Sequence, residues 1–123
     1  MIVIADTSPI CYLILMGRID LLFSLFGSIY IPEAVYNELK HKSSPPSVKE
    51  WATELPEWVH VISSPGIKVD SLSHLHQGEY EVITLAESMQ ADLVIIDEKA
   101  GRQSAKERNL KVTGLLGIIK LAS

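Results

Sequence analysis

The sequence contains little cysteine, no excess of positive charge and no long uninterrupted apolar run. Cys11 is the single cysteine among 123 residues, so an internal disulfide is excluded and a reducing compartment is indicated. The 11 Lys and Arg residues against 15 Asp and Glu give a formal net charge of −4, which argues against a protein that coats nucleic acid or anionic membranes through dense basic patches. Gly17, Arg18 and Asp20 interrupt the apolar stretch at 10–26, so no membrane span is predicted.

The remaining composition is that of one folded domain. Hydrophobic residues make up 47% of the chain and charged residues 21%, which excludes a disordered or low-complexity segment. The length favours a single domain over residues 1–123. Residues 1–6 lack the basic and apolar regions of a secretory signal, so we expect a cytoplasmic protein.

Short β-branched runs alternate with helical patterns along the chain, which is typical of α/β units around a parallel sheet. The predicted strands are 2–5, 28–31, 58–62, 93–96 and 111–113. The predicted helices are 9–16, 18–26, 32–41, a stretch through Trp51, 77–90, 99–108 and 115–122, with turns at 43–47 and 63–66. Because 2–5 and 93–96 are apolar on both faces, we place them centrally, and the alternating run 58–62 is predicted to be an edge strand.

Two aspartates directly follow the predicted central strands. Asp6 comes after 2–5 and Asp97 comes after 93–96. Ligands of open parallel sheets bind beyond the carboxyl ends of the strands, so both carboxylates lie where such folds carry out chemistry. Each aspartate alone is also explained as the N-cap of the following helix, but the pair favours a site.

Two predicted helices place further carboxylates toward their apolar faces. Glu38 lies beside Leu39 on the apolar face of 32–41, where it needs a partner; a salt bridge is the alternative explanation. In helix 77–90, Glu79 lies about 60° from the centre of the apolar stripe and Glu81 about 100° away, at its edge. Both lie in the first turn, where the helix dipole also favours carboxylates.

Carboxylates from four segments would repel one another strongly if they converged. A like-charge pair at about 4 Å costs about 1 kcal/mol in water and about 4 kcal/mol at an effective dielectric near 20. Such a cluster therefore needs either a cation or carboxyl groups with strongly raised pKa values, and if it holds a cation, the oxygen ligands suit Mg²⁺ or Mn²⁺. Ions of this kind activate water and stabilise the leaving oxygen of a phosphodiester.

Four motifs, taken in their order along the chain, resemble the PIN-domain nucleases. They are Ile-Val-Ile-Ala-Asp-Thr-Ser-Pro at 2–9, Val-Tyr-Asn-Glu-Leu at 35–39, Gly-Glu-x-Glu at 78–81 and Asp-Glu-x-x-Gly-Arg at 97–102. The last two resemble a small prokaryotic subgroup in particular, as does Gly-Leu-Leu-Gly-Ile at 114–118. The resemblance covers nearly the whole chain.

This resemblance implies a three-layer α/β/α sandwich and an Mg²⁺- or Mn²⁺-dependent ribonuclease, often the toxin of a toxin–antitoxin pair. RNA would then be the substrate and a protein antitoxin the partner. The positions that match the family's metal ligands are Asp6, Glu38 and Asp97, with either Glu79 or Glu81 as the remaining acid. By the same matching, Thr7 or Ser8 would orient a carboxylate or a metal-bound water, and Arg102 would contact a phosphate or pair with an acid such as Glu98.

The sequence departs from the family at its C-terminus, because it ends at Ser123 where relatives continue through further helical sequence. A homodimer or strand exchange would cover the sheet face, or the toxin is shortened and less active. One alternative is an inactive or regulatory PIN-like binding module. Another is a receiver-like signalling domain, which expects a second acid beside Asp6, where Ala5 and Thr7 stand.

Two further groups have alternative interpretations. His74 and His76 lie two residues apart but lack cysteine partners, so solvated histidines are favoured over a zinc site. Residues 40–42, Lys-His-Lys, lie near Glu38 and would either guide RNA or form a solvated helix end.

Overall fold

The computed structural model describes residues 1–63 and 70–123, so the predicted turn at 63–66 falls outside the described residues from 64 onward. The strands are β1 (Val3–Ala5), β2 (Ile29–Pro32), β3 (Val59–Ile62), β4 (Leu93–Ile95) and β5 (Val112–Thr113). The helices are α1 (Thr7–Leu15), α2 (Asp20–Phe26), α3 (Glu33–Lys40), α4 (Pro46–Thr53), α5 (Gln77–Met89), α6 (Lys99–Glu107) and α7 (Leu115–Ala122), with a 3-10 turn at Asp70–Leu72. Each predicted strand and helix is confirmed.

The strands form one parallel sheet in the order β3-β2-β1-β4-β5. Ile4 of the central strand pairs with Tyr30 on one side and Val94 on the other. The central positions predicted for the first and fourth strands are confirmed, as is the edge position of β3. A receiver-like domain has the strand order 2-1-3-4-5, in which the first strand lies between the second and the third, whereas here β1 lies between β2 and β4, so the topology excludes that alternative.

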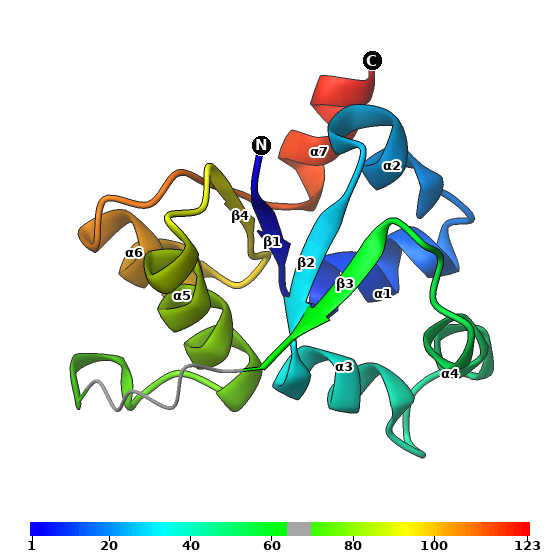
Figure 1. Cartoon of the computed structure of the whole chain (residues 1–123), viewed down its shortest axis with the longest axis horizontal. Coiled ribbons are helices and arrows are strands. Elements are labelled where there is room, and N and C mark those ends of the chain that lie inside the picture. Colours follow the sequence, from blue (N-terminus) through cyan, green and yellow to red (C-terminus); the bar gives the residue numbers. More distant parts are fainter. Residues whose placement is uncertain (64–69) are drawn as a thin grey trace.

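Helices cover both faces of the sheet (Figure 1). On one face, α5 packs against β1, β2 and β4, and α6 packs against β5. On the other face, α2 packs against β2, and the layer is completed by α7, which contacts α2 and α1, and by α4, which contacts α1. The arrangement is the expected three-layer α/β/α sandwich. Helix α3 lies at the carboxyl end of the sheet, where it contacts both α4 and α5.

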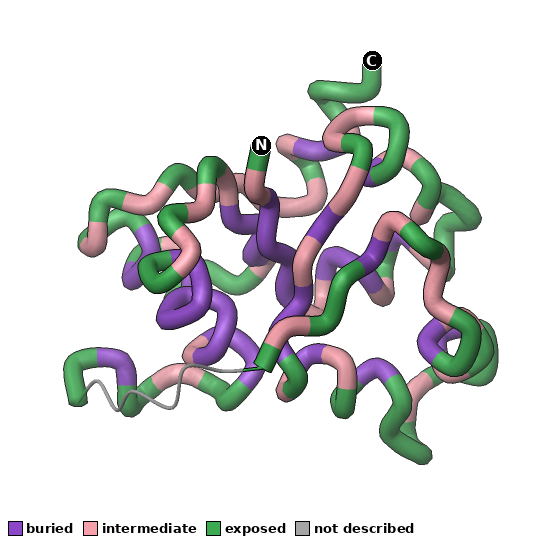
Figure 2. Tube along the Cα trace, in the orientation of Figure 1, coloured by how far each residue is buried: buried purple, intermediate pink, exposed green. Residues whose placement is uncertain are grey.

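Aliphatic side chains from the sheet and from α5 form the core. Residues of β1 are no more than 1% exposed, because helices cover both faces of this central strand. Figure 2 shows the buried segments concentrated in the middle strands and in α5. The buried side chains of α5 include Val82, Ile83, Leu85 and Ala86, which are at most 2% exposed. Removing such side chains from water is the main favourable term for folding.

The strand order creates a crevice between β1 and β4. The chain adds β2 and β3 on one side of β1, then crosses over through α5 and adds β4 and β5 on the other side. The helices that follow β1 and β4 therefore diverge, which is the arrangement that opens a ligand crevice at the carboxyl ends of such sheets. The N–H of Asp6 donates to the carbonyl of Ile95 at 2.9 Å and so fixes Asp6 at this point.

Among the described residues, no single helix has the length and apolar character needed to cross a membrane. Helices α1 and α2 meet these criteria only when taken together, and a bend of 116° separates them.

Candidate active site

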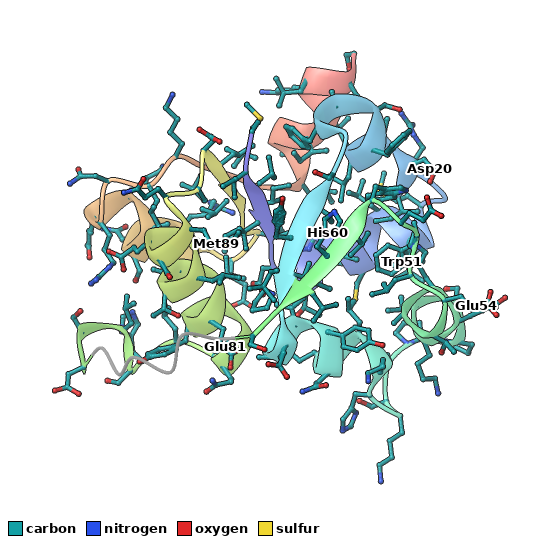
Figure 3. The ribbon with its side chains drawn as sticks, in the orientation of Figure 1. Asp20, Trp51, Glu54, His60, Glu81 and Met89 are labelled. Atoms are coloured by element: carbon teal, nitrogen blue, oxygen red, sulfur yellow. The ribbon has the colours of Figure 1, made fainter. Side chains whose placement is uncertain are left out.

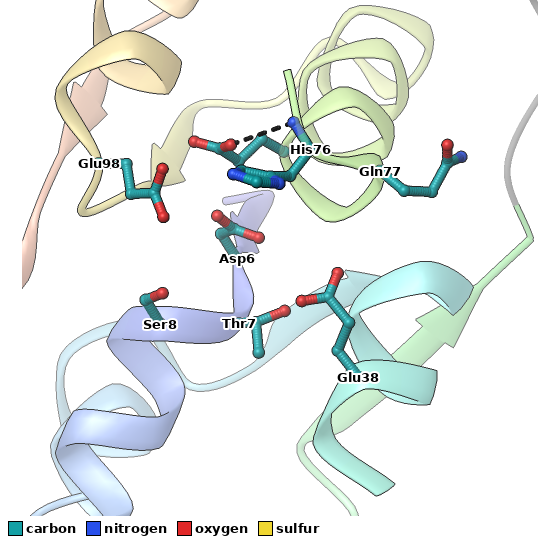
Figure 4. A pocket seen from close by; sticks show the side chains of 8 residues that line it. Asp6, Thr7, Ser8, Glu38, His76, Gln77 and Glu98 are labelled. Carbon is teal, nitrogen blue, oxygen red and sulfur yellow. Dashed lines mark hydrogen bonds between the residues drawn. The ribbon is translucent and has the colours of Figure 1, made fainter. Parts of the chain in front are cut away.

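A cavity of about 310 Å³ lies at the carboxyl ends of the central strands, where α1, α3, α5 and α6 meet (Figure 4). Carboxylates from several segments of the chain face into it. Its lining residues are Asp6, Thr7, Ser8, Glu38, His76, Gln77, Glu79 and Glu98. The structure therefore brings together three of the predicted acidic ligands and both predicted hydroxyl residues.

Asp6 is the most strongly perturbed acid of the cavity. It caps the N-terminus of α1 and is 5% exposed. Burial raises the pKa of its carboxyl to about 7; a hydrogen bond with the backbone of Thr7 offsets part of this effect, while the charges of Glu79, Glu38 and Glu98 raise the pKa further. Asp6 is thus held in a place where its negative charge is costly unless a positive partner is present.

Glu79 is the second buried carboxylate, at 3% exposure. Its Oε1 accepts the backbone N–H of His76 at 3.4 Å, whereas its Oε2 is buried without a hydrogen-bond partner among the described residues. A methyl group at Gly101 would lie 2.5 Å from that Oε2, so the glycine gives the carboxylate its space. Burial and the charge of Glu98 raise the pKa of Glu79.

Gly78 lets the N-terminus of α5 approach the other two acids. A methyl group at this position would collide with Oε1 of Glu38 and would lie 3.1 Å from Oδ1 of Asp6. The glycine and the acid of the Gly-Glu-x-Glu motif thus have separate roles. Gly78 leaves room for two carboxylates, and Glu79 contributes a third.

His76 and Glu98 also line the cavity, although sequence reasoning did not select either residue as a ligand. Each offers a ligand atom, as does Glu79, and these three atoms lie within 4.8 Å of one another. Both are exposed at the surface, and Figure 4 shows their side chains turned into the cavity. Their positions at helix starts could have identified them, because His76 is the N-cap of α5 and Glu98 is the N-cap of α6.

Glu81 lies outside this cavity, at the junction of α5 and α3 (Figure 3). Its Oε1 accepts the N–H of Ala34 at 3.1 Å, and its Oε2 accepts a hydrogen bond from the Gln77 amide at 2.7 Å. Ala34 belongs to the first turn of α3, whose N–H groups lack partners within the helix. Glu81 therefore ties α3 to α5 and lines a neighbouring hollow that includes Glu38.

Asp97 and Arg102 are likewise not among the residues that line the cavity. Oδ1 of Asp97 accepts the N–H of Leu115 at 3.2 Å, at the start of α7. Arg102 donates to the backbone carbonyl of Asp97. The two residues thus connect the turn after β4 to α7, and Glu98 is the acid of this turn that faces the cavity.

Thr7 and Ser8 line the cavity, and Oγ1 of Thr7 is buried without a hydrogen-bond partner in the described part of the chain. Buried hydroxyl groups are rarely left unpaired. This hydroxyl is therefore available to a bound water or to an oxygen of a ligand.

The chain matches a known family in sequence and a solved structure in fold. A protein-family model described as a PIN domain matches residues 2–123. A solved structure, that of a PilT N-terminus domain protein from the hyperthermophilic archaeon Sulfolobus solfataricus P2, is similar with a TM-score of 0.70 and 17% sequence identity. The similarity covers 99% of this chain and 93% of that chain, and at this identity it shows the fold alone. No curated protein matches the sequence.

Proposed function

Because the chain belongs to the PIN-domain family, whose members are generally nucleases, we propose that it is a metal-dependent endoribonuclease that hydrolyses RNA phosphodiester bonds. The observation that carries the proposal is the convergence of Asp6, Glu38 and Glu79 on one cavity at the crevice of the sheet. Oε2 of Glu79, which is buried without a hydrogen-bond partner in the described part of the chain, supports a positively charged ligand at this point of the cavity.

The residues present fit a divalent cation. Asp6, Glu38, Glu79 and Glu98 offer carboxylate oxygens, the ligands that Mg²⁺ and Mn²⁺ accept. Burial and mutual repulsion raise the pKa values of Asp6 and Glu79. A bound cation would lower both pKa values, because it stabilises the ionised carboxylates. When bound, such an ion supplies an activated water and offsets the charge that develops on the leaving oxygen.

The chain's own residues divide into ligands and positioning residues in this proposal. Asp6, Glu38 and Glu79 bind the cation, with Glu98 as the acid contributed by the turn after β4. The hydroxyl groups of Thr7 and Ser8 donate hydrogen bonds to a water or a phosphate oxygen at the cavity wall.

The remaining predicted site residues act through the backbone. Glu81 holds the start of α3 and thereby places Glu38. Asp97 and Arg102 hold the turn that presents Glu98.

Another hollow beside the cavity, distinct from the one lined by Glu81, supports a route for the RNA strand. It shares Thr7 and Glu38 with the cavity and is also lined by Asn37, His41, Ser43 and Ser44. These side chains are hydrogen-bond donors suited to phosphates and bases. The basic cluster at residues 40–42 borders this hollow, so we propose that it attracts the RNA backbone.

The test is RNA cleavage by the purified protein with Mn²⁺ or Mg²⁺. We expect cleavage that EDTA stops and that Asp6→Asn lowers at least about 100-fold, in the range seen when one electrostatic catalytic group is removed. The matched control is Glu54→Gln, which removes an exposed carboxylate from the end of α4 and should cleave normally. Equal cleavage by Asp6→Asn, or cleavage unaffected by EDTA, contradicts the proposal. Metal binding without cleavage of any RNA favours the regulatory binding module.

We also propose a cytoplasmic homodimer that a protein antitoxin inhibits by covering the acidic cavity. Support for the dimer comes from large apolar side chains exposed on α1, on α2 and on α7, the helix that contacts both of the others. These side chains are Tyr12, Leu15, Met16, Phe23, Leu116 and Leu121. Light scattering of the wild type should give twice the chain mass, and Leu116→Ser should lower the measured mass. A monomeric wild type contradicts the dimer.

Co-expression with the product of a neighbouring small gene tests the antitoxin.

A further inference from the structure

We propose that His76 is a nitrogen ligand of the divalent cation and makes the site favour Mn²⁺ over Mg²⁺, an inference that rests on the proposed metal-dependent function. Of the described residues that line the cavity, His76 alone carries an imidazole. The carboxylates beside it are oxygen donors, which do not by themselves separate the two ions strongly.

The distances suit a shared ion. One atom each of His76, Glu79 and Glu98 lies within 4.8 Å of the others. Ligand atoms bonded at about 2.1 Å to one octahedral ion lie about 3.0 Å apart when adjacent and about 4.2 Å apart when opposite. The three groups therefore need to move inward by less than about an ångström. The side chains of His76 and Glu98 are exposed and have room to make that adjustment, while Glu79 is fixed in the core.

An independent observation points to a ligand at this place. Glu79 is 97% buried, yet its Oε2 has no hydrogen-bond partner among the described residues. That oxygen faces Gly101, three residues after Glu98 in the same helical turn. A buried carboxylate oxygen without a partner is costly, and a cation held also by His76 and Glu98 would satisfy it.

The position of His76 in the chain fixes where its ring lies. It is the N-cap of α5, and its backbone N–H donates to Glu79. The hydrogen bond holds the two residues together, so the imidazole and the Glu79 carboxylate face the same cavity, as Figure 4 shows for the ring. The imidazole also accepts the backbone N–H of Glu79 in a capping box, so a ring nitrogen that binds the ion exchanges this hydrogen bond for the metal.

The donor set determines the preferred ion. Mg²⁺ is a hard ion that binds oxygen almost exclusively and keeps several waters, whereas Mn²⁺ lies on the transition-metal series and accepts imidazole nitrogen more readily. One imidazole among carboxylates therefore raises the affinity for Mn²⁺ more than the affinity for Mg²⁺. Removing the ring should lower the preference between the ions rather than abolish binding, because the carboxylates of Asp6, Glu38 and Glu79 remain.

The experiment measures binding of Mn²⁺ and Mg²⁺ alone, by calorimetry, to the wild type and to His76→Asn. Asparagine is a favoured N-cap residue that is too short to reach the ion, so α5 should keep its start. We expect His76→Asn to lower Mn²⁺ affinity at least about tenfold and Mg²⁺ affinity by less than about threefold. The matched control is His74→Asn, an exposed histidine two residues earlier that does not line the cavity, which should leave both affinities unchanged.

Pulsed electron paramagnetic resonance on the Mn²⁺-loaded protein gives a direct readout. A nitrogen coupling from imidazole should appear in the wild type and in His74→Asn and should disappear in His76→Asn. Circular dichroism confirms that the variants fold. Wild-type Mn²⁺ binding without nitrogen coupling, or an unchanged preference in His76→Asn, overturns the role of His76 and leaves the metal site intact. A folded wild type that binds neither ion refutes the proposed function and this inference with it.

Discussion

Asp6→Asn should make the metal-free protein more stable at neutral pH, although it removes a proposed catalytic residue. The carboxyl of Asp6 has a pKa of about 7 in the folded protein against an ordinary value of 3.8, chiefly because it is buried. At about 1.4 kcal/mol per pH unit, ionising it in the folded protein costs about 4 kcal/mol of stability. Asparagine carries no charge and retains an oxygen that accepts a hydrogen bond from the Thr7 backbone.

The direction in which stability changes with pH follows from how many protons the folded and unfolded states bind. Below about pH 4, Asp6 is protonated in both the folded and the unfolded states, so the fold keeps its full stability. Between about pH 4 and pH 7 the folded state retains a proton that the unfolded state has released, so stability falls as the pH rises. Above about pH 7 the loss is complete. The raised pKa of Glu79 acts in the same direction.

The measurement is urea unfolding in EDTA at several pH values between 5 and 8, monitored by circular dichroism. The free energy of unfolding of Asp6→Asn should exceed that of the wild type by about 2–4 kcal/mol at pH 8, and the difference should shrink toward pH 5. Adding Mn²⁺ should stabilise the wild type and have little effect on the variant. Glu54→Gln controls for the loss of an ordinary exposed charge. An Asp6→Asn protein no more stable than the wild type at pH 8 in EDTA refutes the reasoning.

Four other substitutions separate ligands from positioning residues. Gly78→Ala should lower Mn²⁺ affinity at least about tenfold, because its methyl group would collide with Glu38, whereas urea unfolding should show no loss of stability, since alanine favours a helix by about 1 kcal/mol. Glu81→Ala should cost about 1–2 kcal/mol of unfolding free energy and leave Mn²⁺ affinity within about threefold; a large loss of affinity would make it a ligand. Asp97→Ala should lower the free energy of unfolding by about 1 kcal/mol and leave Mn²⁺ affinity unchanged. Glu98→Ala should instead lower Mn²⁺ affinity and leave the free energy of unfolding unchanged. The same result for both variants would contradict the assignment of Asp97 as a positioning residue and Glu98 as a ligand.

The sheet was predictable because its central strands are buried on both faces. Residues 2–5 and 93–96 are apolar at successive positions, which only a strand covered by helices on both sides tolerates. The inward direction of Glu79 followed from helical periodicity, since it lies on an apolar face that must meet the sheet, whereas Glu38 lines the cavity but stays exposed. Local sequence was sufficient wherever one regular element determined where the side chain points.

Prediction was weaker where two distant segments determine the partner of a side chain. Asp97 and Glu98 are adjacent, and which of them faces the cavity depends on where α7 begins, through the N–H of Leu115. Glu81 bonds Ala34, which lies 47 residues away in the chain, and no local pattern reports that contact. His76 precedes a helix, where neither periodicity of 3.6 nor of 2 assigns a face.

Helix termini alone do not hold the carboxylates of the cavity together. Asp6 and Glu98 are the N-caps of α1 and α6, and Glu79 lies in the first turn of α5, so the positive ends of three helices face the acids. Each helix terminus contributes about 0.3–1 kcal/mol to a nearby anion, or up to about 3 kcal/mol for the three. The charge of Asp6 alone costs about 4 kcal/mol at neutral pH, before Glu79 is counted. The helix termini therefore offset only part of the cost of the buried charge, and a proton or a divalent cation in the cavity would remove the rest.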